Sequence, residues 1–251
     1  MKKILLTCCI ISAMLLMSCA SASKTRKQHA VNCSEKLHQA LIKFEKKKYT
    51  SAQYLLTEVM EKCPGSMGQD TLIMYLGKSW LGMRKPAEAK IEFSRLVQSF
   101  PASPLAVEAY YLVGYSAFLA SNPITLDQTS TKEAMQTLEN VVDRYPGTSY
   151  ADSAKIYVAM CIDKMAGKEF VNARFYESIN RYESAIVYYK YVIEQYPSSS
   201  LVARSKLLMA VALFKLNRND EANALLDELI DQSEDKTIVK EAQALKKQQK
   251  H

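Results

Sequence analysis

Apolar positions recur along this chain at one fixed set of offsets. The clearest copy starts at Ala89, continues with apolar residues at offsets +4, +7 and +11, and has a proline at +12. Offsets of 4, 7 and 11 fall on one face of an α-helix, and a proline one residue later ends that helix. The pattern begins again at Ala52, Ala134 and Ala185, and a fifth copy from Ala222 has lost the proline. A repeated amphipathic helix with a fixed end predicts a helical solenoid.

Each repeated helix is predicted to be the second helix of a hairpin. A small residue stands twelve positions before three of the alanines, which lets two helix backbones approach closely: Ala40, Gly77 and Ala210. A Ser or Thr stands two residues or so after each stop proline, where it is a natural N-cap for the next helix: Ser66, Ser103, Thr148 and Ser199. This unit resembles the tetratricopeptide repeat (TPR), although Trp80 is not at the signature tryptophan position of that family.

The predicted fold is therefore all-α, a TPR-like helical solenoid of about five helix-hairpin repeats and about eleven helices. Such arrays bury a core only by stacking, so we expect a curved superhelix with an extended concave groove. The repeat domain is expected over residues 33–233. Residues 234–251 are expected as a charged C-terminal tail, partly helical or disordered.

The spacing of the repeat alanines is irregular in two places. Successive intervals are 37, 45, 51 and 37 residues, so the second and third carry 8 and 14 extra residues. The 8 lie in the polar stretch 120–131, which contains Pro123 and predicts a loop within a hairpin. The 14 follow a normal helix over 150–165, and we assign them to an additional short helix at Gly167–Asn180.

The N-terminus has the features of a secretion signal. A charged start is followed by the apolar run Ile4–Leu16, shorter than the roughly 20 residues of a membrane span. Residues 16–19 (LMSC) resemble a bacterial lipobox, in which Cys19 becomes a lipidated N-terminus; an ordinary signal peptide with an incidental cysteine is the alternative. We predict a lipoprotein signal peptide over 1–18 and a lipidated polar tether over 19–32. Ala20, directly after Cys19, resembles the signal of lipoproteins that are sorted to the outer membrane. We expect the folded body to lie in the periplasm.

Three cysteines follow the predicted tether. Cys33 opens the first helix and Cys63 closes the second, and these ends are neighbours in an antiparallel hairpin. The periplasm permits disulfides, so a Cys33–Cys63 bond is one prediction. The alternative is that two small apolar residues merely fall at these positions. Cys161 is expected to be a packed core thiol.

Composition argues against several other classes of protein. Few glycines and prolines, 7 of each in 251 residues, favour helices over sheets. The net charge of +7 is spread along the helices, which does not suit a nucleic-acid groove. Only three histidines are present, with no phosphate-binding loop, so no metal site or catalytic triad is expected. We therefore predict a protein that is not an enzyme and has no cofactor beyond the covalent lipid at Cys19.

Tyrosines gather in the third and fourth repeats. Tyr189 and Tyr196 occupy packing positions of the repeat and are expected in the core. For Tyr111 and Tyr115, on the first helix of the third repeat, two interpretations stay open. One places them in the core, and the other in the groove as anchors for an extended peptide.

The lipobox, the polar tether, the five repeats, the loop Leu126–Thr131 and the extra segment Lys168–Ile179 together resemble the BamD family. These are lipoprotein subunits of the bacterial outer-membrane β-barrel assembly machine, the BAM complex. The resemblance implies an outer-membrane scaffold facing the periplasm. Its C-terminal repeats would bind the POTRA domains of the barrel subunit BamA. Its N-terminal repeats would hold nascent outer-membrane proteins or other BAM lipoproteins.

Five residues are candidate groove or partner contacts under this resemblance: Lys78, Tyr111, Tyr115, Asp127 and Tyr188. Tyr188 stands where many family members carry an arginine, which puts a docking salt bridge there in doubt. One alternative is a TPR lipoprotein that scaffolds peptidoglycan enzymes or a pilus or secretion apparatus, but a plain array would keep 37-residue intervals. A glycan-binding lipoprotein of the SusD kind is a second alternative, but those chains are far longer.

Overall fold

The computed structural model describes residues 33–63 and 68–249, and every regular element in these ranges is an α-helix. The predicted all-α fold of stacked helix hairpins is thereby confirmed. The predictions for the signal peptide, Cys19, the tether and Ser66 lie outside the described residues. Two compact units make up the chain, unit 1 up to Ala109 and unit 2 from Tyr110.

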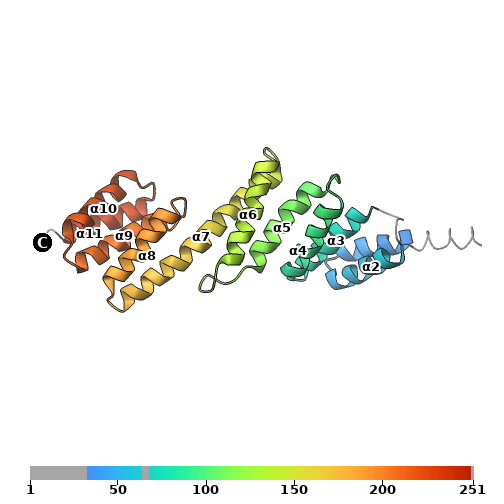
Figure 1. The fold of residues 1–251 in the computed structure, drawn as a ribbon, viewed down its shortest axis with the longest axis horizontal. Helices are drawn as coiled ribbons and strands as arrows, with labels where there is room; N and C mark the ends of the chain where they lie inside the picture. The colour runs from blue at the N-terminus through green and yellow to red at the C-terminus, as the bar shows by residue number, and fades with distance from the viewer. Residues whose placement is uncertain (1–32, 64–67, 250–251) are drawn as a thin grey trace, which may run out of the picture. The chain divides into compact units, whose positions relative to one another are not determined.

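Unit 1 contains the first two hairpins and the first turn of the helix that follows them. Its elements are the helix over residues 33–45, α2 (Tyr49–Lys62), α3 (Gln69–Gly82), α4 (Pro86–Ser99) and the start of α5 (Ala106–Ala120) (Figure 1). Helix α3 packs against both α2 and α4. The buried residues of α4 include Ala89, Phe93 and Leu96, the positions that the repeat pattern places on one face. A Cβ at Gly77 would lie 2.5 Å from the Phe93 ring, so this close approach requires glycine.

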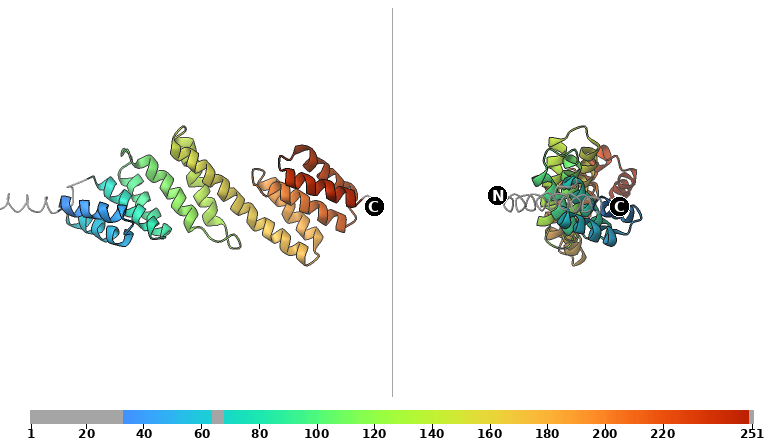
Figure 2. Two further views of the ribbon diagram at one scale, coloured as in Figure 1. Left: turned by 180° about the vertical axis from the view of Figure 1, so that it is seen from behind. Right: turned by 90° about the vertical axis from the view of Figure 1, so that its right-hand side faces the viewer.

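Unit 2 contains the remaining repeats and one final helix. After α5 come α6 (Thr129–Arg144), α7 (Ser149–Ser178), α8 (Tyr182–Gln195), α9 (Val202–Lys215), α10 (Asn219–Gln232) and α11 (Lys236–Gln248) (Figures 1 and 2). From α6 onward, each helix packs against the next along the chain. Ile238 and Ala242 of α11 are buried in the same core as Leu226 and Leu229 of α10. Most of the expected tail is thus a helix that covers the last repeat.

Four hairpins share one type of turn between their helices. Each has a residue with φ between 56° and 58° just before the second helix begins: Lys47, Arg84, Asn180 and Asn217. The left-handed conformation reverses the chain within a few residues. In the third hairpin the loop over residues 121–128 takes the place of this turn.

The prediction of a separate short helix at Gly167–Asn180 is wrong. Helix α7 has 30 residues, from Ser149 to Ser178, and Figure 1 shows it as one continuous helix. A glycine inside a helix costs only about 1 kcal/mol relative to alanine, which does not end it. The helix over residues 33–45 and the ten from α2 to α11 do give eleven helices in the described chain. The eleventh, however, is α11 and not a separate segment before the fourth repeat.

The residues predicted as N-caps behave in two ways. Thr148 is the N-cap of α7, where its Oγ1 accepts a hydrogen bond from the Ala151 N–H at 3.1 Å. Ser103 and Ser199 cap a short turn instead, because α5 and α9 begin only at residues 106 and 202. Their hydroxyls also donate to carboxylates of the preceding repeat: Ser103 to Asp70 at 2.5 Å, and Ser199 to Asp163 at 2.7 Å.

Candidate partner-binding surfaces

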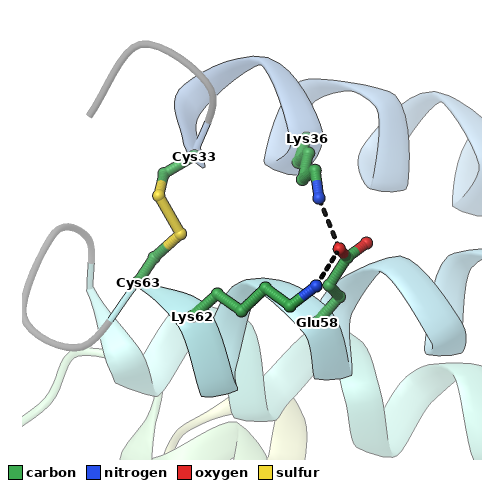
Figure 3. The surroundings of a disulfide bond; sticks show 5 residues. All are labelled: Cys33, Lys36, Glu58, Lys62 and Cys63. Carbon is green, nitrogen blue, oxygen red and sulfur yellow. Dashed lines mark hydrogen bonds and ion pairs between the residues drawn. A yellow bond between two sulfur atoms is a disulfide. The ribbon is translucent and has the colours of Figure 1, made fainter. Parts of the chain in front are cut away.

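A disulfide between Cys33 and Cys63 joins the two helices of the first hairpin at the end opposite their turn. The Cα atoms are 6.1 Å apart, and the bond joins the first described residue to the C-cap of α2 (Figure 3). Residue 33 is also where the predicted tether would join the folded repeats. The structure therefore brings the two predicted cysteines together at the place where the membrane anchor would act.

A carboxylate with two ammonium partners lies beside this disulfide. Glu58 on α2 pairs with Lys36 on the first helix and with Lys62 one turn along α2, the latter at 2.8 Å (Figure 3). Hydrogen bonds from Lys36 and Lys62 lower the pKa of Glu58 to about 2. The Lys36–Glu58 contact crosses between helices, so it adds a second link within the same hairpin.

Lys78, the candidate contact in unit 1, is already engaged within the unit. Its Nζ is 2.7 Å from Glu108 Oε1 and 6.0 Å from the centroid of the Tyr75 ring. One third of the Lys78 side chain is exposed. The ammonium is therefore held in place, and the exposed part can still meet a partner.

Tyr111 and Tyr115 belong to a cluster of aromatic rings between α5 and α7. Their rings stack with centroids 6.0 Å apart, and Tyr157 of α7 lies edge-on to Tyr115 at 4.9 Å. Burial raises the pKa of Tyr111 to about 12. Both tyrosines are nevertheless only partly buried. Their rings pack against Tyr157 of α7, and part of each side chain stays exposed, so a role as anchors for a peptide stays a prediction.

The loop over residues 121–128 is a compact, self-bonded element. The Gln128 amide donates to the carbonyls of Pro123 (2.8 Å) and Leu126 (3.0 Å) and accepts from the Thr131 hydroxyl at 2.7 Å. Asp127, a candidate contact, accepts from the Thr129 N–H at 2.9 Å, and hydrogen bonds from the side chain and the backbone of Thr129 lower its pKa. Asp127 is exposed and lies two residues before the start of α6, so within the fold its carboxylate ties the end of the loop to the first residue of that helix.

The two irregular stretches of the sequence meet in space. A Cβ at Gly167 of α7 would lie 2.3 Å from Ile124 Cδ1, so the loop rests directly on the continued part of that helix. Lys164 of α7 donates to the carbonyl of Ser121 at 3.3 Å. Sequence reasoning found both insertions but missed this contact. The one signal for it in the sequence is Gly167, a glycine within a helical pattern.

Beyond this contact, α7 presents an apolar stripe to solvent. Val171 and Phe175 of α7 and its C-cap residue Ile179 follow one another at spacings of four residues and are 40%, 58% and 49% exposed. Residues four apart lie on one face of a helix. We call these three residues the α7 stripe.

Tyr188, the last candidate contact, lies on α8 and is stacked on Tyr176 of α7. The ring centroids are 5.3 Å apart and the planes differ by 11°. The neighbouring Tyr176 is the main cause of a raised pKa at Tyr188. This side chain is thus ordered by a neighbour but remains partly exposed.

The ranges 33–63 and 68–249 contain neither a metal-binding cluster nor a helix that could span a membrane. Among these residues, no three His, Cys, Asp or Glu side chains come close enough to hold a metal ion. None of the helices described by the structure has the length and apolar character needed to cross a bilayer. Cys161 is fully buried, and burial raises the pKa of its thiol to about 11, as expected for a packed, unreactive thiol.

Comparison with known proteins gives one consistent family. The model of the YfiO family, described as outer membrane lipoprotein, matches residues 30–228. The outer membrane protein assembly factor BamD of Caulobacter vibrioides is 30% identical over 165 residues, which cover 66% of this chain and 54% of that protein. BamD of Rickettsia prowazekii is 23% identical over 218 residues, which cover 87% of this chain and 86% of that protein.

The chain therefore spans about half the length of the Caulobacter relative and most of the Rickettsia one. Among solved structures, the TPR domain of P58(IPK) is similar, with 17% sequence identity and a TM-score of 0.44. The aligned region covers 86% of this chain and 56% of that chain.

Proposed function

This chain belongs to the YfiO family of outer membrane lipoproteins, and from that premise we propose that it is a lipid-anchored scaffold subunit of the machine that assembles outer-membrane β-barrel proteins. The observation that carries the proposal is the family match over residues 30–228, which runs from before the first helix into α10. The relatives bearing the name of an outer membrane protein assembly factor support it. The protein acts by binding partners and is not an enzyme.

The partner of unit 2 is the POTRA region of a BamA-like barrel subunit. The α7 stripe supports this assignment, because three large apolar side chains in a row on one helix face are suited to a protein interface. The loop over 121–128 holds α7 where the stripe begins, since Ile124 rests on Gly167. Tyr188 lies nearby in sequence on α8 and offers an aromatic edge in place of the arginine of many relatives.

Nascent outer-membrane proteins are the proposed second class of partner. Their strands are extended, with alternating apolar and polar side chains. On unit 2, the half-buried rings of Tyr111 and Tyr115 supply apolar anchoring and Asp127 supplies a charge; unit 1 by itself offers the charge of Lys78. Rigid aromatic groups with a polar surround are typical of such anchoring.

The anchor is the lipid on Cys19, which would hold the repeats at the periplasmic face of the outer membrane. Acyl chains contribute about 0.8 kcal/mol per buried methylene, so several chains on one cysteine give durable attachment. Cys19→Ala is expected to abolish labelling by a fatty-acid analogue and to release the protein from the membrane fraction. Unchanged labelling in Cys19→Ala would show that this cysteine carries no lipid.

A pull-down from detergent-solubilised envelopes tests the proposed function. We expect the wild-type chain to recover a BamA-like barrel subunit. Recovery of cell-wall hydrolases or secretion components without any barrel-assembly subunit would refute the proposal and favour the alternative scaffold role.

The same assay tests the α7 stripe. Phe175→Asp places a charge on the stripe and is expected to lower recovery of the barrel subunit at least roughly tenfold, as for a central apolar interface residue. Ile91→Asp is the matched control, because Ile91 on α4 is 67% exposed and lies in unit 1. Equal recovery by the two variants would exclude the stripe from the interface.

A further inference from the structure

Unit 1 has an open cleft between α2 and α4, with α3 as its floor. The cleft has a volume of about 520 Å³, and its floor is formed by Leu76 and Trp80. Glu61 and Met60 line it from α2, and Glu92 and Arg95 line it from α4. Volumes of 300–1,000 Å³ are the usual range for ligand pockets. None of the surfaces described above includes these residues.

Glu92 is the unusual group in this cleft. Its Oε2 atom is buried and has no hydrogen-bond donor among the described residues. The guanidinium of Arg95 is the nearest cation, but its Nη1 is 3.7 Å from Oε2, which is too long for a hydrogen bond. Burial raises the pKa of the Glu92 carboxyl. Buried polar atoms almost always have a partner, so this oxygen is available to accept a hydrogen bond from an occupant of the cleft.

Arg95 does not fill this role. Its side chain is half exposed, and its Nη1 lies 3.3 Å from the Met60 sulfur, so the guanidinium reaches across from α4 to α2. With Glu61 exposed on the opposite wall, the cleft holds two carboxylates and one cation. The charge in the cleft therefore favours a positively charged occupant.

Trp80 adds a surface that suits the same occupant. It is only partly buried, and the Lys85 Nζ already lies 5.2 Å from the centroid of its ring. Indole is the aromatic group with the strongest attraction for cations, and it also covers the alkyl chain of lysine or arginine well. A carboxylate and an indole that line one cleft are complementary to both parts of such a side chain.

We propose that this cleft binds an arginine or lysine side chain from an extended segment of a partner polypeptide. Glu92 accepts hydrogen bonds from the cationic group, and Trp80 covers the alkyl chain. The cleft lies wholly within unit 1, so the proposal does not depend on the α7 stripe or on the barrel subunit.

The chain carries its own reporter for this site, because Trp80 is its only tryptophan. The full chain in detergent is titrated with the capped tripeptide acetyl-Gly-Arg-Gly-amide while tryptophan emission is recorded. The control ligand is the same peptide with citrulline, which keeps the shape of arginine but has no charge. We expect a saturable change with the arginine peptide and at least about tenfold weaker binding of the citrulline peptide, because hydrogen bonds between charged groups are about twice as strong as neutral ones.

Two variants complete the test. Glu92→Gln keeps the size of the side chain and is expected to weaken binding of the arginine peptide roughly tenfold. Glu45→Gln removes an exposed carboxylate outside the cleft and is expected to bind like the wild type. Equal affinity for the two peptides, or an unchanged affinity in Glu92→Gln, would overturn the proposal. If Glu92→Gln fails to fold by circular dichroism, the two peptides on the wild-type chain decide the matter alone.

Discussion

Removal of the Cys33–Cys63 disulfide should loosen the first hairpin and leave the other repeats intact. The bond closes a loop with a sequence separation of 30 residues. The bond lowers the entropy of the unfolded chain, and for a loop of this length the resulting stabilisation of the folded hairpin is about 3.6 kcal/mol at 25 °C. In a solenoid each repeat depends on its neighbours, and a terminal repeat has a neighbour on one side only. The loss should therefore appear as local opening of the hairpin.

Hydrogen exchange measured by mass spectrometry follows this opening directly. In the double variant Cys33→Ala/Cys63→Ala, a loss of about 3.6 kcal/mol corresponds to amide exchange roughly 400-fold faster over residues 33–63. Exchange in α8 to α10 should be unchanged. Double substitution avoids a leftover thiol, and the buried Cys161 remains in both proteins.

A reductant supplies the control for this experiment. It should accelerate exchange over residues 33–63 in the wild type and have no effect on the double variant, which has no disulfide there. Two results would refute the reasoning. One is exchange in the first hairpin that is unchanged without the bond. The other is a uniform acceleration along the whole chain, which would show that the repeats open as one unit.

Three further predictions concern single side chains. The pKa of Glu58 falls from 4.5 to about 2 on folding, so its ion pairs stabilise the hairpin above pH about 4.5 and are lost as the pH falls toward 2. Glu58→Gln should remove that part of the acid sensitivity in pH-dependent melting curves, and an unaltered pH profile would contradict this expectation. Gly77→Ala forces the buried Phe93 ring to move, and the overpacking cost of about 1–3 kcal/mol less the helix gain of about 1 kcal/mol should lower stability by up to about 2 kcal/mol. A raised melting temperature would show that the ring moves freely. Gln128→Ala leaves two loop carbonyls without their donor and should cost about 1–3 kcal/mol in urea unfolding; a cost near zero would show that water replaces the amide.

The sequence was most informative wherever a structural feature is local. The buried faces of α2, α4, α6 and α8 include the residues at the repeat offsets, because helix periodicity and a following proline act over a few residues only. The pairing of Cys33 with Cys63 could also be anticipated, since the ends of an antiparallel hairpin must be neighbours.

Predictions that depended on contacts between distant residues were less complete. Ser103 and Ser199 were expected only as caps, but each also bonds an aspartate 33 or 36 residues earlier. Lys78 and Asp127 were chosen as partner contacts, and the structure shows that each has a role within the fold. The cleft around Trp80 was not predicted, because its residues come from three helices and share no pattern in the sequence.

The sequence by itself determined the repeat, the hairpins, the two irregular intervals and the family. Each of these depends on residue type and short spacing, which a linear pattern records completely. Only the tertiary structure decided what the irregular intervals build. Gly167 was interpreted as the start of a new helix, whereas α7 continues through it and the glycine makes room for Ile124, 43 residues earlier. A glycine that ends a helix and one that admits a neighbouring side chain look the same in sequence, because the difference lies in the atoms packed against the missing Cβ.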